Sequence, residues 1–136
     1  MATTTATITL SSSDIADNSL SISNTATLTT AGTNTGLTET TGLARKKIAS
    51  ATEVDLLTLE NLEVTALKSA KVYIKNTSTH TDKYALIGIG EATGTPIYLG
   101  RLYGGDWMWF PWDVDDDITI KPSDAEKMTV EYQVFS

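Results

Sequence analysis

The sequence predicts an all-β protein, a β-sandwich of jelly-roll-like type with an extended Thr-rich N-terminal arm. The first reason is composition: of 136 residues, 24 are Thr and 11 are Ser. The β-branched Thr favours extended backbone because its stiff side chain packs well on a pleated surface. The second reason is pattern, because short segments alternate between apolar and polar residues and turn residues separate them. Several short strands of this kind favour a sandwich or a barrel.

The length and composition exclude several classes of protein. A chain of this size suits one domain, or one domain with an arm. It has no Cys, one His and a net charge of −7. Disulfide scaffolds, thiol nucleophiles and thiolate metal sites are therefore excluded, and the acidic balance argues against a nucleic-acid partner. No run approaches the ~20 apolar residues of a membrane span, and the N-terminus lacks the basic residues of a secretory signal. No cofactor is predicted.

Charge and complexity divide the chain into an arm, residues 1–36, and a sandwich body, residues 37–136. Residues 1–42 contain three acidic residues and no basic ones, whereas residues 106–136 contain eight acidic and two basic residues. The Gly- and Thr-rich stretch 31–36 is predicted to be a flexible link between arm and body.

Two related strands are predicted in the arm, at 5–10 and 20–30, around a turn at 14–18. Apolar residues alternate in both: Ala6, Ile8 and Leu10 share one face, and Leu20 with Ile22, then Ala26 with Leu28, share another. Such strands gain little on burial, at ~25 cal/mol per Å², against an ordering cost of about 1–2 kcal/mol per residue. We expect the body, a sister subunit or a larger assembly to order them.

The body is predicted to contain a series of short strands. Residues 52–58 are assigned to a strand, although a short helix is an alternative, and residues 59–70 are ambiguous, with a helical turn possible through 60–67. The remaining predicted strands are 71–75, Tyr84–Ile89, Ile97–Tyr103, 107–110, 118–121 and Met128–Phe135. The clearest is the last, in which Met128, Val130, Tyr132 and Val134 occupy one face.

Three tryptophans lie close together at Trp107, Trp109 and Trp112. Period-2 geometry places Trp107 and Trp109 on one face of a strand, where they could stack on a sugar ring or a base. Aromatic residues more often fill a core or a subunit contact, and we favour that interpretation. Pro111 lacks an N–H, so the strand must end there or lie at a sheet edge.

A short basic patch, Arg45, Lys46 and Lys47, precedes the predicted body strands. Three consecutive charges usually face solvent. The sharper hypothesis is a contact with an acidic surface of a neighbouring chain.

The remaining motifs do not make a catalytic or metal site. The acidic run 113–117 resembles the start of a calcium loop, but Ile118 occupies the position that requires Gly, so a solvated turn is favoured. The glycine cluster 88–94 has the spacing of a hairpin turn rather than of a dinucleotide fingerprint, and His80 has no second histidine nearby. Since no nucleophile elbow, zinc motif or phosphate loop is present, we expect no enzymatic activity.

Three segments resemble small structural proteins of tailed bacteriophages. They are KVYIKNT at 71–77, LGRLYGGDWMWFPWD at 99–113 and MTVEYQVF at 128–135, and the Thr-rich opening is similar in composition. The resemblance implies a β-rich, catalytically inert virion protein, often a capsid cement (decoration) protein that sits as a trimer between capsomers. It implies no residue-level site.

We therefore expect a non-enzymatic capsid cement protein on the virion surface, whose partners are the major capsid protein and further copies of itself as a homotrimer, without nucleic acid or membrane. The candidate interface residues are Ile8, Leu10, Leu20, Ile22, Arg45, Lys46, Lys47, Trp107, Trp109 and Trp112. The alternative is a tail- or fibre-associated module that contacts a glycan or receptor through the three tryptophans.

Overall fold

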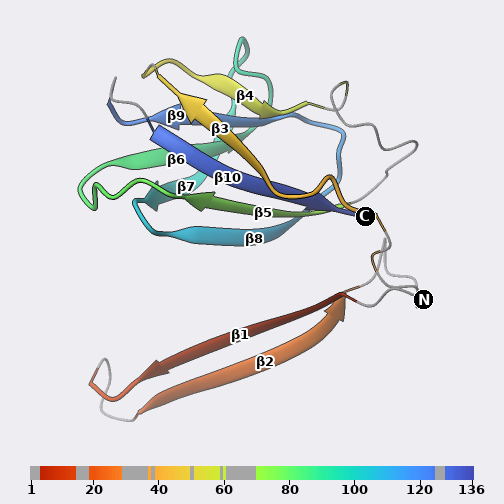
Figure 1. Cartoon of the computed structure of the whole chain (residues 1–136), viewed down its shortest axis with the longest axis vertical. Helices are drawn as coiled ribbons and strands as arrows, with labels where there is room; N and C mark the ends of the chain where they lie inside the picture. Colours follow the sequence, from red (N-terminus) through yellow and green to blue (C-terminus); the bar gives the residue numbers. More distant parts are fainter. Residues whose placement is uncertain are drawn as a thin grey trace. The chain divides into compact units, whose positions relative to one another are not determined.

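The protein is all-β. The computed structural model describes residues 4–14, 19–28, 37, 39–49, 51–58, 60, 70–124 and 128–136, and every regular element in them is a strand (Figure 1). The chain divides into two compact units, Met1–Thr38 and Glu39–Ser136. The expected link at 31–36, most of the expected turn at 14–18 and nearly all of the ambiguous segment 59–70 lie outside the described residues.

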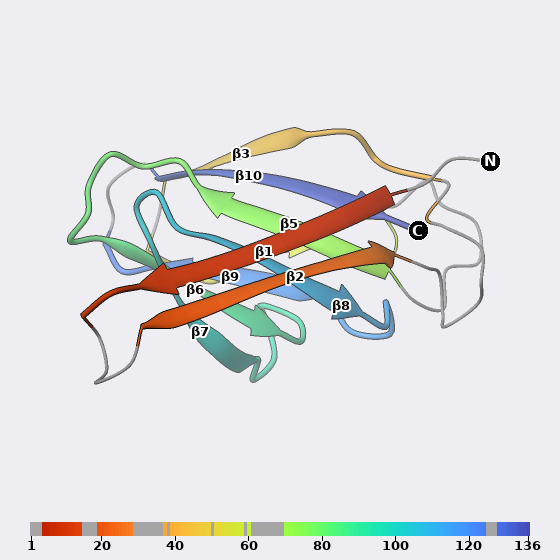
Figure 2. The same cartoon turned by 90° about the horizontal axis from the view of Figure 1, so that it is seen from below.

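The first unit contains an antiparallel hairpin of β1 (Thr4–Ser12) and β2 (Leu20–Leu28) (Figure 2). The two related strands predicted from the sequence are thus confirmed. Their register pairs Leu10 with Ile22 and Ala6 with Ala26. Because directly paired residues of an antiparallel ladder lie on the same side, the apolar residues of both strands share one face of the ribbon, and not two as the sequence analysis had it.

The second unit is a sandwich of two four-stranded antiparallel sheets (Figure 1). One sheet has the strand order β3-β10-β5-β8 and the other β4-β9-β6-β7. The bounds are β3 Ala44–Ile48, β4 Val54–Leu57, β5 Ala70–Asn76, β6 Tyr84–Ile89, β7 Ile97–Tyr103, β8 Trp107–Trp112, β9 Ile118–Pro122 and β10 Met128–Phe135.

The strand order is that of a jelly roll. Strand β10 inserts between β3 and β5 in one sheet, and β9 inserts between β4 and β6 in the other. This interleaving of early and late strands over two sheets is the double Greek key of jelly-roll domains. The predicted sandwich of jelly-roll-like type is therefore confirmed.

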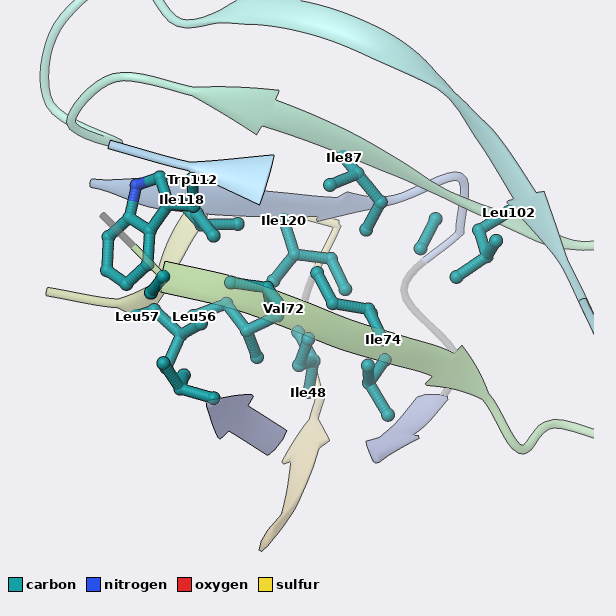
Figure 3. Packing of buried hydrophobic residues seen from close by; sticks show 14 of the residues in the cluster. Ile48, Leu56, Leu57, Val72, Ile74, Ile87, Leu102, Trp112, Ile118 and Ile120 are labelled. Atoms are coloured by element: carbon teal, nitrogen blue, oxygen red, sulfur yellow. The ribbon is translucent and has the colours of Figure 1, made fainter. Parts of the chain in front are cut away.

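The core lies between the two sheets. Val72 and Ile74 of β5, Ile120 of β9 and Val130 of β10 are fully buried, and Figure 3 shows Val72, Ile74 and Ile120 among the side chains that meet there. Alternate residues of each strand supply this core because successive side chains point to opposite faces. Each such side chain contributes about 1.5–3 kcal/mol on full burial.

Most body strands were predicted with accurate bounds. The strands Tyr84–Ile89, Ile97–Tyr103 and Met128–Phe135 are confirmed residue for residue, and β4 confirms the strand interpretation of 52–58. Strand β8 continues through Pro111 to Trp112, which is tolerated because β8 lies at the edge of its sheet. Strand β3 was not predicted, because its three consecutive basic residues look like a solvated patch.

A buried amide fixes the turn that leads into β8. Asn76, at the end of β5, is fully buried. Its Nδ2 donates to the carbonyl oxygen of Leu102 at 3.0 Å, and its Oδ1 accepts from the backbone N–H of Ser78 at 3.0 Å. Its backbone also pairs with Gly105 and Asp106. These bonds hold the β7–β8 turn against β5 and so set where Trp107 begins its strand.

Candidate interaction surfaces

The hairpin has an apolar face that is exposed and free of charge. Leu10 is 51% exposed and Ile22 is 39% exposed, and Ile8 and Leu20 are also exposed. Neither strand contains a charged residue. The members of the apolar face are Ala6, Ile8, Leu10, Leu20, Ile22, Ala26 and Leu28. Four large aliphatic side chains that lie open together on one ribbon mark a surface for contact with a partner.

The opposite side of the hairpin carries hydroxyl groups at every paired position. Its members are Thr5, Thr7, Thr9, Ser11, Ser21, Ser23, Thr25 and Thr27. The Oγ1 atoms of Thr7 and Thr25 are 2.9 Å apart and form a cross-strand hydrogen bond. The hairpin is therefore amphipathic, and an isolated two-stranded ribbon is marginally stable in water, so a partner on the apolar face would stabilise it.

In the body, the outer face of the β3-β10-β5-β8 sheet is basic and aromatic. The chain has ten Lys and Arg residues, of which four lie on this face with one carboxylate. We call it the cationic face; its members are Arg45, Lys47, Lys71, Tyr73, Lys75, Trp107, Trp109, Thr129, Glu131, Gln133 and Phe135, placed together by the strand register. Its charge is opposite in sign to that of the whole chain.

Aromatic rings occupy the centre of the cationic face. Trp109 and Phe135 meet with ring centroids 5.1 Å apart across β5, and Trp107 is 54% exposed. Trp107 and Trp109 lie on the same face of β8, as predicted. Trp112 was also predicted to be an interface residue, and this prediction is corrected. Alternation through Pro111 turns its side chain inward, where it is 3% exposed.

The basic residues of β3 do not act as one patch. Arg45 Nε donates to Glu131 Oε1 at 2.7 Å. Lys46 points to the other side of the strand and its Nζ donates to the backbone oxygen of Asp55, so the expectation that it joins an exposed basic patch is corrected. Lys47 is exposed and, like Lys71 and Lys75, forms no ion pair with the described part of the chain.

The cationic face ends in a shallow hollow of about 460 Å³ beside the Arg45–Glu131 pair, lined also by Thr129 and residues 77–80. At the centre of the face, burial and, to a smaller extent, the Glu131 carboxylate raise the pKa of the Tyr73 hydroxyl above its ordinary value. Tyr73 is therefore a neutral hydrogen-bonding group at every physiological pH.

Strand β7 presents exposed apolar side chains at an open sheet edge, a surface that the sequence did not predict. Ile97 is 75% exposed, and Leu99 and Tyr98 are also exposed, on the last strand of the β4-β9-β6-β7 sheet. Two of the other terminal strands of the body are blunted, by lysines in β3 and by a proline in β8, whereas β4 and β7 each have a register irregularity. The apolar run after Pro96 was visible in the sequence, but its place at an edge was not.

The acidic run 113–117 forms the loop between β8 and β9. Asp113, Asp115 and Asp116 are exposed, whereas Val114 is buried. Over the described residues, no group of three or more His, Asp or Glu side chains is arranged to hold a metal ion. Nor does the same part of the chain contain a helix long and apolar enough to span a membrane.

Comparison of the chain with protein-family models, with curated proteins and with solved structures finds no match.

Proposed function

We propose that this chain is a non-enzymatic structural protein of a virus particle, of the capsid cement type, that assembles with a major capsid protein and with copies of itself as a homotrimer. The observation that carries the proposal is the hairpin. It is uncharged, it leaves Ile8, Leu10, Leu20 and Ile22 exposed on one face, and it forms a unit of its own.

Such a hairpin suits docking onto another protein. Its apolar face supplies contact area, and the unpaired outer edges of β1 and β2 can add to a neighbouring sheet. Contacts of this kind, repeated by symmetry over a shell, give strong attachment through avidity even where each is weak. The jelly-roll body supports the proposal by analogy, because viral capsid proteins use this architecture, although lectins share it.

Imaging of intact particles tests the proposal directly. We expect reconstructions of the virion to place one knob of density for each body on the outer shell, with the hairpin against a capsid subunit. Particles produced without the protein should keep the shell and lose the knobs. Protein that is abundant in infected cells and absent from finished particles would contradict the proposal.

A second candidate function is glycan or receptor binding at a tail, which the exposure of Trp107 beside Trp109 favours. Since Trp112 is buried, only two of the three tryptophans could take part. Tryptophan fluorescence against a glycan panel separates the two functions. A binding platform should shift its emission with sugar, and Trp107→Ala should remove the shift, whereas a contact with protein should respond only to dissociation of the assembly.

A further inference from the structure

The cationic face is complementary in charge to an acidic partner, and the acidity of the chain itself favours a second copy as that partner. Lys47, Lys71 and Lys75 have no ion-pair partner in the described part of the molecule, although acidic residues outnumber basic ones by 17 to 10. Copies with a net charge of −7 repel one another unless they meet where opposite charges face each other. The cationic face can supply the positive surface of such a contact.

The centre of this face has the composition of a protein contact. Tyr73, Trp109 and Phe135 form an aromatic centre, and the basic side chains lie around it. Tryptophan, tyrosine and arginine are the residues that most often dominate binding energy at the centre of an interface. A hollow of about 460 Å³ beside Arg45 and Glu131 adds a concave region at the end of the same face.

The loop 113–117 can supply the negative surface of the same contact. Trp112 and Val114 are buried on either side of Asp113. Trp112 Nε1 donates to the backbone oxygen of Asp116 at 2.8 Å. The backbone N–H of Gly90 donates to the backbone oxygen of Asp117, also at 2.8 Å. These anchors fix the loop while leaving the Asp113, Asp115 and Asp116 carboxylates in solvent. A fixed loop loses little conformational entropy on binding, so its carboxylates are preorganised for a cationic surface.

We propose that the cationic face of one copy binds the acidic loop 113–117 of the next copy. Because the two surfaces differ, the contact is heterologous, and three copies joined head to tail close into a ring if the rotation is 120°. The proposal rests on the self-association that forms part of the proposed function and deepens it by naming the two surfaces. Lys71 and Lys75 of one copy face Asp115 and Asp116 of its neighbour.

Charge reversal in the full chain, followed by sedimentation equilibrium, tests this contact. We expect the wild-type protein to sediment as an oligomer, with a trimer predominating, that dissociates as NaCl rises from about 50 to about 500 mM because salt screens the paired charges. The face variant Lys71→Glu/Lys75→Glu and the loop variant Asp115→Lys/Asp116→Lys should each raise the dissociation constant about 100-fold or more. A variant with all four substitutions should regain assembly, because both charges of each pair are reversed.

Mixing the two double variants distinguishes this contact from a symmetric one. The intact loop of the face variant should bind the intact face of the loop variant, and the reversed face of the first should bind the reversed loop of the second. An equimolar mixture should therefore form open assemblies in which the two variants alternate, but no closed trimer, because a three-membered ring must contain one repulsive contact between two copies of the same variant. A symmetric contact would instead stop at a dimer of one copy of each. The matched control is Arg101→Glu/Lys121→Glu, which makes the same change in net charge on the other sheet and should leave the oligomer intact. Thermal unfolding of each variant establishes that it is folded.

Several outcomes would overturn the inference. A monomeric wild-type protein, face and loop variants that assemble as the wild type does, or a four-residue variant that stays monomeric would each do so. A face variant with unchanged mass that loses binding to a polyanion, such as an acidic polysaccharide or single-stranded nucleic acid, would assign the face to that ligand instead. None of these outcomes bears on whether the protein is found on particles, which the imaging experiment decides separately.

Discussion

Replacement of one cross-strand pair on the apolar face of the hairpin should weaken attachment to particles by a calculable amount. Leu10 and Ile22 lie opposite each other in the register and are 51% and 39% exposed. Since full burial of such a side chain is worth about 1.5–3 kcal/mol, burying the exposed part of each contributes about 1 kcal/mol. The double variant Leu10→Thr/Ile22→Thr should therefore lose about 2 kcal/mol of binding, or roughly 30-fold in Kd.

The assay is a titration of full-length protein onto particles that lack it, with bound protein measured after pelleting. The neighbouring pair Thr9 and Ser23 lies on the hydroxyl side of the same ribbon and supplies the control. The exchange Thr9→Ser/Ser23→Thr leaves the composition unchanged and should leave Kd within about twofold. The melting temperature of the body should not change in either variant, because the hairpin belongs to a separate unit. Equal affinities for the Leu10/Ile22 variant and the wild type would refute the reasoning.

Three further predictions concern the stability of the body. Ile120→Ala should lower the free energy of unfolding by about 2–5 kcal/mol, because it leaves a cavity at a fully buried position; urea denaturation measures this, and a loss below about 1 kcal/mol would mean that the two sheets close over the gap. Gly104→Ala should also destabilise, since a Cβ there would lie 2.5 Å from the His80 carbonyl oxygen and 2.7 Å from that of Ser78, and a melting temperature equal to that of the wild type would contradict it. The raised pKa of Tyr73 means that the folded state holds the phenol proton more tightly than the unfolded state, so its contribution to the free energy of unfolding is complete below pH 10, the ordinary Tyr value, and is lost as pH rises through the raised pKa. Tyr73→Phe should therefore flatten the fall in the free energy of unfolding between pH 9 and 11, measured by urea denaturation. An unchanged slope would argue against the assignment.

The parts of the fold that follow from local alternation were predictable. In β10, Met128, Val130 and Val134 are buried as their spacing requires, because a strand with one face in the core carries its own register in the sequence. Local pattern failed at β3, where Lys46 reaches the Asp55 carbonyl with the charged end of an otherwise apolar side chain. A lysine in a strand cannot be distinguished from a solvated lysine until its neighbour is known.

The candidate surfaces were predictable only where one strand determines them. The position of Trp107 and Trp109 on one face follows from the alternation of side chains along a strand. The same alternation, continued through Pro111, would have placed Trp112 on the inner face. The cationic face could not be foreseen, because Arg45, Lys71 and Glu131 come from three strands that the jelly-roll order places side by side. The open edge at Ile97 depends equally on the order of strands in a sheet, which no local pattern encodes.

The absence of charge from the hairpin makes ionic strength a means of separating its contacts from those of the body. Dissolved ions have no charged group to shield on β1 or β2, and strongly hydrated salts such as sulfate reinforce the burial of aliphatic surface. Under the proposed function, a particle washed in concentrated sulfate should therefore keep this protein attached through its hairpin, while the ion pairs between neighbouring bodies are screened. The contacts made by the hairpin and those made by the body would then be measured separately on the same particles.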